Sequence, residues 1–207
     1  MVSRRGRFGK YGDFKRKSLL RAQRSLPPKD TKIKTAKGQS PLPKTRYQPL
    51  PPQFSVREAH MGDMPFIRSL SLKAFQQYGP YEESIPAWQA YPSTITFMAA
   101  RGIEPVGFAM IGPSFEKDSG VSELLAISVA EPWRRRSVGT MLLKAAEKRA
   151  TTLGMKRMVL HTAVENLAAM GLFRKMGYRE VKIKKGFYPA GQDAVMMIKE
   201  LYPPVNP

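Results

Sequence analysis

The chain has 207 residues and a formal net charge of +19 at pH 7, which is enough for one domain of ordinary size and an extension. It has no cysteine and only two histidines, which excludes disulfides, thiolate metal sites, a cysteine nucleophile and a histidine-rich centre, so no metal is predicted. No apolar run approaches the roughly 18–20 residues that span a membrane, and no secretory signal follows the basic start. We therefore expect a cytoplasmic protein without membrane contact.

The positive charge is concentrated in residues 1–53, which hold 15 Lys and Arg against 2 Asp and Glu. This segment mixes cations with Gly, Pro and aromatic residues and has little apolar surface, which predicts a disordered basic extension. Such an extension can contact RNA or the ribosome through counterion release and stacking. It can also be an inert solvated tail, or a cleavable organelle-import peptide if the source is eukaryotic.

A folded domain is predicted over residues 54–202, followed by a C-terminal tail at 203–207. Residues 54–58 alternate like an opening strand, and Asp63 is a plausible N-cap for a helix over 64–75. Residues 76–95 are interpreted as a loop-and-helix region. Strands at 94–100 and 106–111 are predicted to form a hairpin around Gly102.

A longer strand is predicted at 119–129, and an amphipathic helix at 138–153 follows it. Next come a short strand at 158–161 and a helix that Asn166 caps and that runs through Met176, with Gly177 as the residue after its end. Strands near 178–184 and 194–199 complete the domain. Antiparallel strands followed by strand–helix units predict a mixed α/β sheet.

The junction between the strand at 119–129 and its helix is the most informative segment. Small residues at the helix start leave backbone N–H groups open to an anion, and nearby arginines add positive charge. This arrangement predicts a pyrophosphate-binding turn. Its residues are Arg134, Arg135, Arg136, Ser137, Val138, Gly139 and Thr140.

This order of elements resembles the acetyl-coenzyme A motif of the GNAT N-acetyltransferase superfamily, Gln/Arg-x-x-Gly-x-Gly/Ala. Arg134 and Gly139 match it, and Ser137 replaces the first glycine. A second stretch is similar to the later superfamily signature Asn-x-x-Ala-x-x-Leu-Tyr-x-x-x-Gly-Phe, and the matching positions are Asn166, Ala169, Leu172, Phe173, Gly177 and Tyr178. The resemblance implies the GNAT fold, whose mostly antiparallel sheet splays at the acetyl-coenzyme A site.

Acetyl transfer to an amine needs a base, because the amine is largely protonated at neutral pH. Glu123 stands at the strand position where many GNAT enzymes carry a catalytic glutamate. His161 resembles the histidine that acts as base in N-terminal protein acetyltransferases, and the two candidates stay open. Phe173 replaces a tyrosine that the superfamily often uses as general acid. Tyr188, in a loop resembling the acceptor-binding loop of those enzymes, is an alternative acid or a substrate contact.

The remaining assignments follow from the same resemblance. The oxyanion is expected to meet backbone N–H groups near Ser128 and Val129, and Ile127 and Val129 supply main-chain contacts to acetyl-coenzyme A. Asn166 and Phe173 are assigned to the same site. The expected contacts to the acceptor amine come from Tyr81, Glu82 and Glu83.

These observations predict an acetyl-coenzyme A dependent N-acetyltransferase that transfers acetyl directly to a primary amine. A protein α-amine or lysine is the preferred acceptor, and a small-molecule amine such as a polyamine or an antibiotic stays open. The motifs are closest to those of protein N-terminal acetyltransferases of the ribosomal-protein type. The alternative is a GNAT-fold module with weak catalysis that binds RNA or the ribosome through its basic extension.

Overall fold

The computed structural model describes residues 53–114 and 120–202. Nearly all of the predicted extension, the tail at 203–207 and the predicted strand start at Ser119 therefore lie outside the described residues. The described part is a mixed α/β structure, as predicted. Its elements are β1 (Phe54–Glu58), η1 (Met61–Asp63), α1 (Met64–Phe75), α2 (Tyr81–Gln89), β2 (Ile95–Arg101), β3 (Glu104–Pro113), β4 (Val121–Val129), η2 (Glu131–Trp133), α3 (Val138–Thr152), β5 (Arg157–Ala163), α4 (Leu167–Lys175), β6 (Arg179–Lys184) and β7 (Ala194–Glu200).

One sheet organises the described residues, with strand order β1-β2-β3-β4-β5-β7-β6. Neighbouring strands are antiparallel except β4 and β5, which run parallel. The mostly antiparallel sheet and the β2–β3 hairpin are thus confirmed. The hairpin turns at Gly102, whose φ of 61° lies in the left-handed region that glycine adopts without strain.

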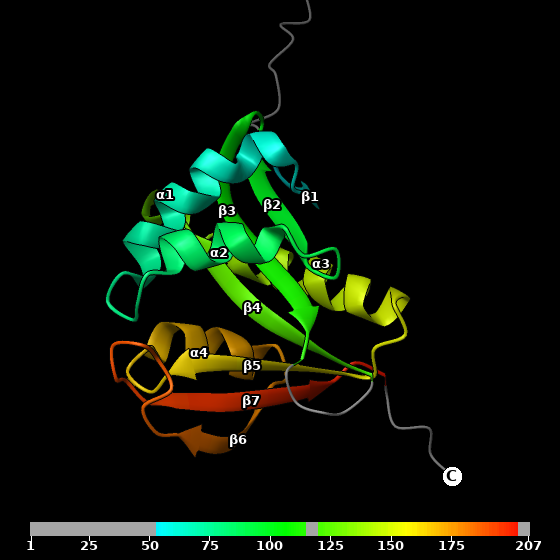
Figure 1. Ribbon diagram of the computed structural model, residues 1–207. Helices are drawn as coiled ribbons and strands as arrows, with labels where there is room; N and C mark the ends of the chain where they lie inside the picture. Colours follow the sequence, from blue (N-terminus) through cyan, green and yellow to red (C-terminus); the bar gives the residue numbers. More distant parts are fainter. Residues whose placement is uncertain (1–52, 115–119, 203–207) are drawn as a thin grey trace, which may run out of the picture. The chain divides into compact units, whose positions relative to one another are not determined.

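Helices cover both faces of the sheet. Figure 1 shows α1 and α2 in front of β2, β3 and β4, and α3 behind them. One core cluster joins α3 and α4 to one face of the sheet, and a second joins α1 and α2 to the other. Because β2 and β3 are buried on both faces, their sequences are continuously apolar instead of alternating.

The fourth helix begins and ends as its sequence predicts. The side chain of Asn166 accepts a hydrogen bond from the N–H of Ala169 at 3.2 Å, and Gly177 follows the helix with a φ of 87°. Both features supply partners or conformations that a helix end requires. Both ends of α4 are therefore set by residues close to them in the sequence.

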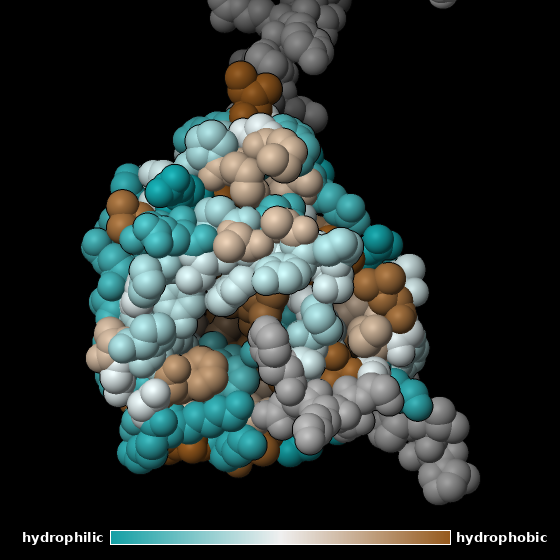
Figure 2. Space-filling model, in the orientation of Figure 1, coloured by the Kyte–Doolittle hydropathy of each residue, from teal (hydrophilic) through white to brown (hydrophobic). Residues whose placement is uncertain are grey.

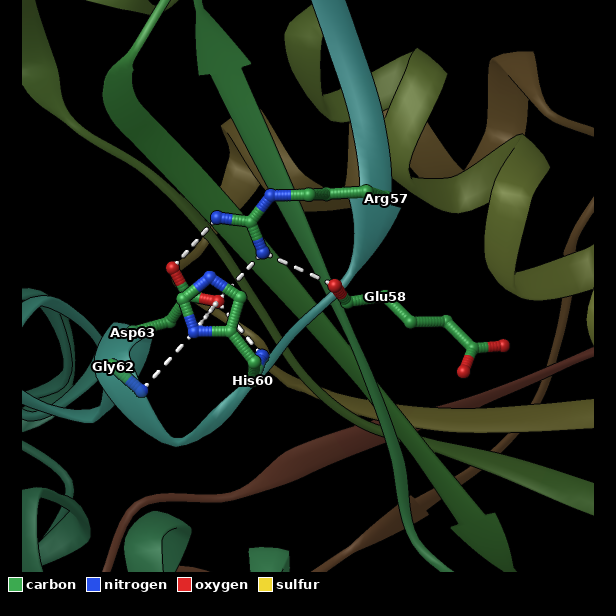
Figure 3. A network of polar contacts seen from close by, with 5 residues as sticks. All are labelled: Arg57, Glu58, His60, Gly62 and Asp63. Carbon is green, nitrogen blue, oxygen red and sulfur yellow. Dashed lines mark hydrogen bonds and ion pairs between the residues drawn. The ribbon is translucent and has the colours of Figure 1, made fainter. Parts of the chain in front are cut away.

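Asp63 occupies the N-cap position of α1, as predicted, but its side chain makes no hydrogen bond to the helix. The carboxylate instead accepts two hydrogen bonds from Arg57 of β1, at 2.7 and 2.8 Å, and one from the N–H of His60 at 2.8 Å (Figure 3). His60 in turn accepts from the N–H of Gly62. The network holds the start of α1 against the first strand.

Candidate active site

The sheet splits between β4 and β5. Their parallel pairing ends at Leu124↔Leu160, although β4 continues to Val129 and β5 to Ala163. The two strands diverge beyond this pair (Figure 1). The edge of β4 that faces β5 therefore lacks sheet hydrogen bonds over its second half, which is the predicted splay.

The backbone groups in this gap follow from the pairing of β4 with β3. The N–H of Ala130 donates to the carbonyl of Val106 at 2.9 Å. Since N–H groups alternate sides along a strand, the N–H of Ser128 also faces β3. Of the two residues named for the oxyanion, Val129 is therefore the one whose N–H is open to the gap. The N–H groups of Ile127 and Val129 face the gap and fit the predicted main-chain contacts.

A strained basic turn leads from the gap into α3. Arg135 and Ser137 have φ of 61° and 62°, a left-handed conformation that costs an L-residue about 1–2 kcal/mol. The first hydrogen bond of the helix runs from Met141 N–H to Ser137 C=O at 3.0 Å, so the N–H groups of 138–140 have no acceptor within the helix. Val138 buries its side chain and offers only its backbone. An anion fits this turn.

Three arginines and a tryptophan border the same turn. Arg134 donates from Nε to the carbonyl of Val129 at 3.0 Å, which ties the turn to the end of β4. Arg136 and Arg101 place their guanidinium groups 5.5 and 4.9 Å from the ring centroid of Trp133. These cation–π contacts hold positive charge beside the helix start without neutralising it.

The first turn of α3 packs closely on α4. A Cβ added at Gly139 would lie 3.2 Å from Cδ2 of Leu172 and 3.9 Å from Cγ2 of Val129, so a larger residue would crowd both the helix and the strand. Asn166 and Phe173, the other predicted acetyl-coenzyme A contacts, line the cavity described next. Phe173 is also a core residue with 3% exposure.

A cavity of about 460 Å³ passes through the split sheet. On the α3–α4 side it reaches Leu124, Leu160 and Phe173, which belong to one core cluster. On the α1–α2 side it reaches residues of the other cluster, including Ile85 and Trp88. Figure 2 shows a hollow with an apolar interior on the α1–α2 face. Two reactants can therefore approach one point from opposite faces.

The two predicted bases meet in this cavity. Nδ1 of His161 lies 3.0 Å from Oε1 of Glu123, and their side chains are only 7% and 10% exposed. Both residues follow the alternation of Val121 and Val159, so they lie on the α1–α2 face of the sheet. Nε2 of His161 is buried and has no hydrogen-bond partner among the described residues.

The loop at 185–193 covers the pair. The ring of Phe187 stacks on the His161 imidazole with a centroid distance of 4.4 Å and an interplanar angle of 15°. Asp193 closes the loop through Lys185 at 2.6 Å and the N–H of Gly186 at 2.9 Å, and the Lys185 ammonium, with that N–H, holds the pKa of the Asp193 carboxyl below its usual range. The imidazole is thus fixed on one face.

The same loop is joined to the segment between α1 and α2. Gln192 donates to the carbonyl of Gln77 at 2.7 Å, and the N–H of Ala190 donates to the carbonyl of Tyr78 at 3.1 Å. Tyr188 packs on Tyr78 with centroids 4.8 Å apart. Burial raises the pKa of the Tyr188 hydroxyl, which makes it a poor proton donor to a leaving group and a better hydrogen-bonding contact.

The predicted acceptor contacts are only partly brought together. Tyr81 lines the cavity, whereas Glu82 and Glu83 are not among its lining residues, and the carboxylate that does line it is that of Glu123. Sequence reasoning missed several apolar lining residues. The density of aromatic residues in 75–91 and 186–188 was the available signal, and the lining residues missed were Phe75, Ile85, Leu125, Phe187 and Pro189.

Comparison with known proteins assigns the family. Residues 56–178 match the acetyltransferase (GNAT) family model. An N-alpha-acetyltransferase of Sulfurisphaera tokodaii is 28% identical over 160 residues, which covers 72% of this chain and 94% of that protein. The ribosomal-protein-S18-alanine N-acetyltransferase of Escherichia coli superposes with a TM-score of 0.64 at 18% identity, covering 75% and 99% of the two chains. The structure of Arabidopsis thaliana NAA60 in complex with acetyl-CoA superposes with a TM-score of 0.62 at 17% identity, and the match covers 72% of this chain and 98% of that chain.

The chain therefore belongs to the GNAT acetyltransferase family. It is an N-acetyltransferase, and its acetyl donor is acetyl-coenzyme A. The residues present fit this donor: the turn at 134–140 offers free N–H groups and arginines to a pyrophosphate, and the open edge of β4 offers backbone groups to an amide-bearing arm. Bound there, acetyl-coenzyme A supplies an activated acetyl thioester.

The described residues contain neither a group of side chains suited to a metal ion nor a helix suited to span a membrane. No group of His, Asp and Glu in 53–114 and 120–202 is arranged to hold a metal ion. None of the helices in these ranges combines the length and apolar character needed to cross a bilayer.

Proposed function

We propose that this enzyme acetylates the α-amine of a protein or peptide. The observation that carries the proposal is the cavity through the split sheet, which has the buried Glu123–His161 pair on the face opposite the pyrophosphate turn. The relatives named N-alpha-acetyltransferase and ribosomal-protein-S18-alanine N-acetyltransferase support an N-terminal acceptor. An α-amine has an ordinary pKa near 7.7–8.0 against about 10.4 for lysine, so it is easier to deprotonate.

The amine must lose a proton before it attacks. A carboxylate only accepts hydrogen bonds, so Glu123 at 3.0 Å selects the tautomer of His161 that carries its proton on Nδ1. Nε2 then keeps its lone pair in the cavity wall and takes the proton from the ammonium group. Glu123 acts through His161 and is a positioning residue, and it also stabilises the imidazolium that forms.

The neutral amine attacks the thioester carbonyl carbon from the α1–α2 face. The N–C bond forms, the C–S bond breaks with its electrons on sulfur, and the nitrogen gives up its second proton to that thiolate or to solvent. The N–H of Val129 is the backbone donor for the developing oxyanion. The acetyl group passes directly from the thioester to the amine, without an acetyl-enzyme intermediate. His161 takes only a proton in this step.

A peptide with one free α-amine and one internal lysine tests this proposal. We expect mass spectrometry of the product to locate the acetyl group on the α-amine, with turnover that requires acetyl-coenzyme A. The control is the same peptide with its N-terminus already acetylated, which should stay unmodified. Acetylation of the lysine in either peptide, or of neither amine, would contradict the proposal.

A further inference from the structure

The part of the cavity on the α1–α2 face is built almost wholly of apolar and aromatic side chains. We call it the acceptor wall. Tyr81 is its centre, since its ring makes edge contacts with Phe75, Trp88 and Tyr188 at centroid distances of 5.9, 6.0 and 6.3 Å. The acceptor wall consists of Phe75, Tyr78, Tyr81, Ile85, Trp88, Leu125 and Tyr188.

Charge is scarce around this wall. Apart from tyrosine hydroxyls, the ionisable residues that line the cavity are Glu123, His161 and Lys184. The first two are bonded to each other, and the ammonium group of Lys184 lies 5.6 Å from the Phe187 ring centroid. Burial raises the pKa of the hydroxyls of Tyr81 and Tyr188, consistent with a poorly hydrated wall. The wall residues themselves carry no ionisable group other than tyrosine hydroxyls, so a charged side chain packed against them would lose hydration.

The wall stands beside the proton-accepting pair. Glu123 and His161 lie on this face of the sheet, and Tyr188 follows directly on Phe187, which stacks on His161. An amine that reaches Nε2 of His161 therefore brings the side chain on its own α-carbon against the acceptor wall. In a lysine acceptor this neighbouring group would be a plain methylene chain, whereas in an α-amine acceptor it is the first side chain of the substrate.

We propose that the acceptor wall selects protein N-termini whose first residue is large and apolar, such as leucine, methionine or phenylalanine. This inference rests on the α-amine function proposed above. The physical reason is that a large apolar side chain leaves water for aromatic surface, while serine or aspartate leaves that surface wet and loses its own hydration. Discrimination by a few methylenes in an apolar pocket is worth about tenfold to a few hundredfold in kcat/KM.

The test is a panel of peptides, identical except for their first residue, assayed with the unmodified full-length enzyme. We expect kcat/KM for Leu, Met and Phe peptides to exceed that for Ser, Ala, Asp and Lys peptides by tenfold or more. Equal rates across the panel, or a preference for small or charged first residues, would overturn the inference and leave the α-amine function standing. Failure to acetylate any α-amine would remove the proposed function itself.

Variants at Trp88 show whether the wall causes the preference. Trp88→Ala should lower kcat/KM for the Leu peptide about tenfold more than for the Ala peptide, and Trp88→Phe should restore most of this difference. Tyr91→Ala is the matched control, because Tyr91 is an aromatic residue just beyond α2 that is 62% exposed and outside the cavity lining. An equal loss for both peptides in Trp88→Ala, with no rescue in Trp88→Phe, would contradict the assignment.

Discussion

The contact between Glu123 and His161 predicts that the two residues act as a unit, which a double-mutant cycle can test. His161→Ala removes the proton acceptor, and Glu123→Gln removes the charge that selects its tautomer while it preserves the shape of the side chain. Neither change empties a large volume of the core, since both side chains border the cavity.

The expected magnitudes follow from the chemistry of the pair. Loss of a general base lowers the rate by about 10²–10⁴-fold, which we expect for His161→Ala. The Nδ1–Oε1 contact is 3.0 Å between side chains that are 7% and 10% exposed. A hydrogen bond to a charged group contributes about 1.5–3 kcal/mol, so Glu123→Gln should cost about 10–150-fold in kcat.

The cycle is measured as kcat at saturating acetyl-coenzyme A and peptide, with circular dichroism to show that each variant is folded. The double variant should be no slower than His161→Ala alone, because Glu123 acts only through His161. The chain has two histidines, so nitrogen-15 spectra of the imidazoles, with His60→Gln for assignment, should show the Nδ1–H tautomer of His161.

If the losses in kcat of the two single variants multiply in the double variant, Glu123 and His161 do not act as a unit. A larger loss in Glu123→Gln than in His161→Ala would also refute this reasoning, because it would make the carboxylate the proton acceptor itself. A wild-type His161 that carries its proton on Nε2 would contradict the mechanism even if both variants were inactive.

Three further predictions concern the turn at 134–140 and the ion pair between Arg57 and Asp63. Ser137→Gly should raise Tm by about 1–4 °C. It relieves the left-handed strain at this position, worth about 1–2 kcal/mol, and glycine costs about 0.5–1 kcal/mol in chain entropy. A lower Tm in thermal unfolding would count against strain at Ser137. Gly139→Asp should abolish acetyl-coenzyme A binding in calorimetry, because it puts a negative charge at the start of α3 and a Cβ 3.2 Å from Cδ2 of Leu172. The control Gly171→Asp, which has open space at its Cβ, should bind normally. Equal binding by both variants would contradict the prediction that this turn binds acetyl-coenzyme A. The hydrogen bonds from Arg57 lower the pKa of Asp63 to about 2, so the ion pair stabilises the fold above the ordinary aspartate pKa and this stabilisation is lost as pH falls toward 2. Asp63→Asn should therefore lower the free energy of unfolding in urea by about 1–2 kcal/mol at pH 7 and by much less near pH 2. A loss of stability that does not depend on pH would argue against the ion pair.

Predictions that concern the basic extension stay predictions. Contact of residues 1–53 with RNA or the ribosome, an import role for them, and a cytoplasmic location are tested by none of the observations above. Turnover and salt-dependent RNA binding, compared between the full chain and a form without these residues, would separate an accessory tail from a binding function.

Features of this protein that depend on neighbours along the chain could be predicted from residue types alone. The order of strands and helices, the cap at Asn166, the end at Gly177 and the turn that begins at Arg134 all follow from residue types a few positions apart. Local backbone hydrogen bonds and φ preferences decide such features, which is why they could be predicted and why they carried the family resemblance.

Contacts between residues far apart in the chain became known from the fold. Glu123 and His161 were separate candidates for one role until the parallel pairing of β4 with β5 placed them in contact. Asp63 could not be separated from an ordinary N-cap, because its partner Arg57 lies on a strand that only the folded sheet positions. The acceptor wall likewise draws residues from α1, α2, β4 and the loop at 185–193, since side-chain contacts in a cavity depend on packing across elements and leave no fixed spacing in the chain.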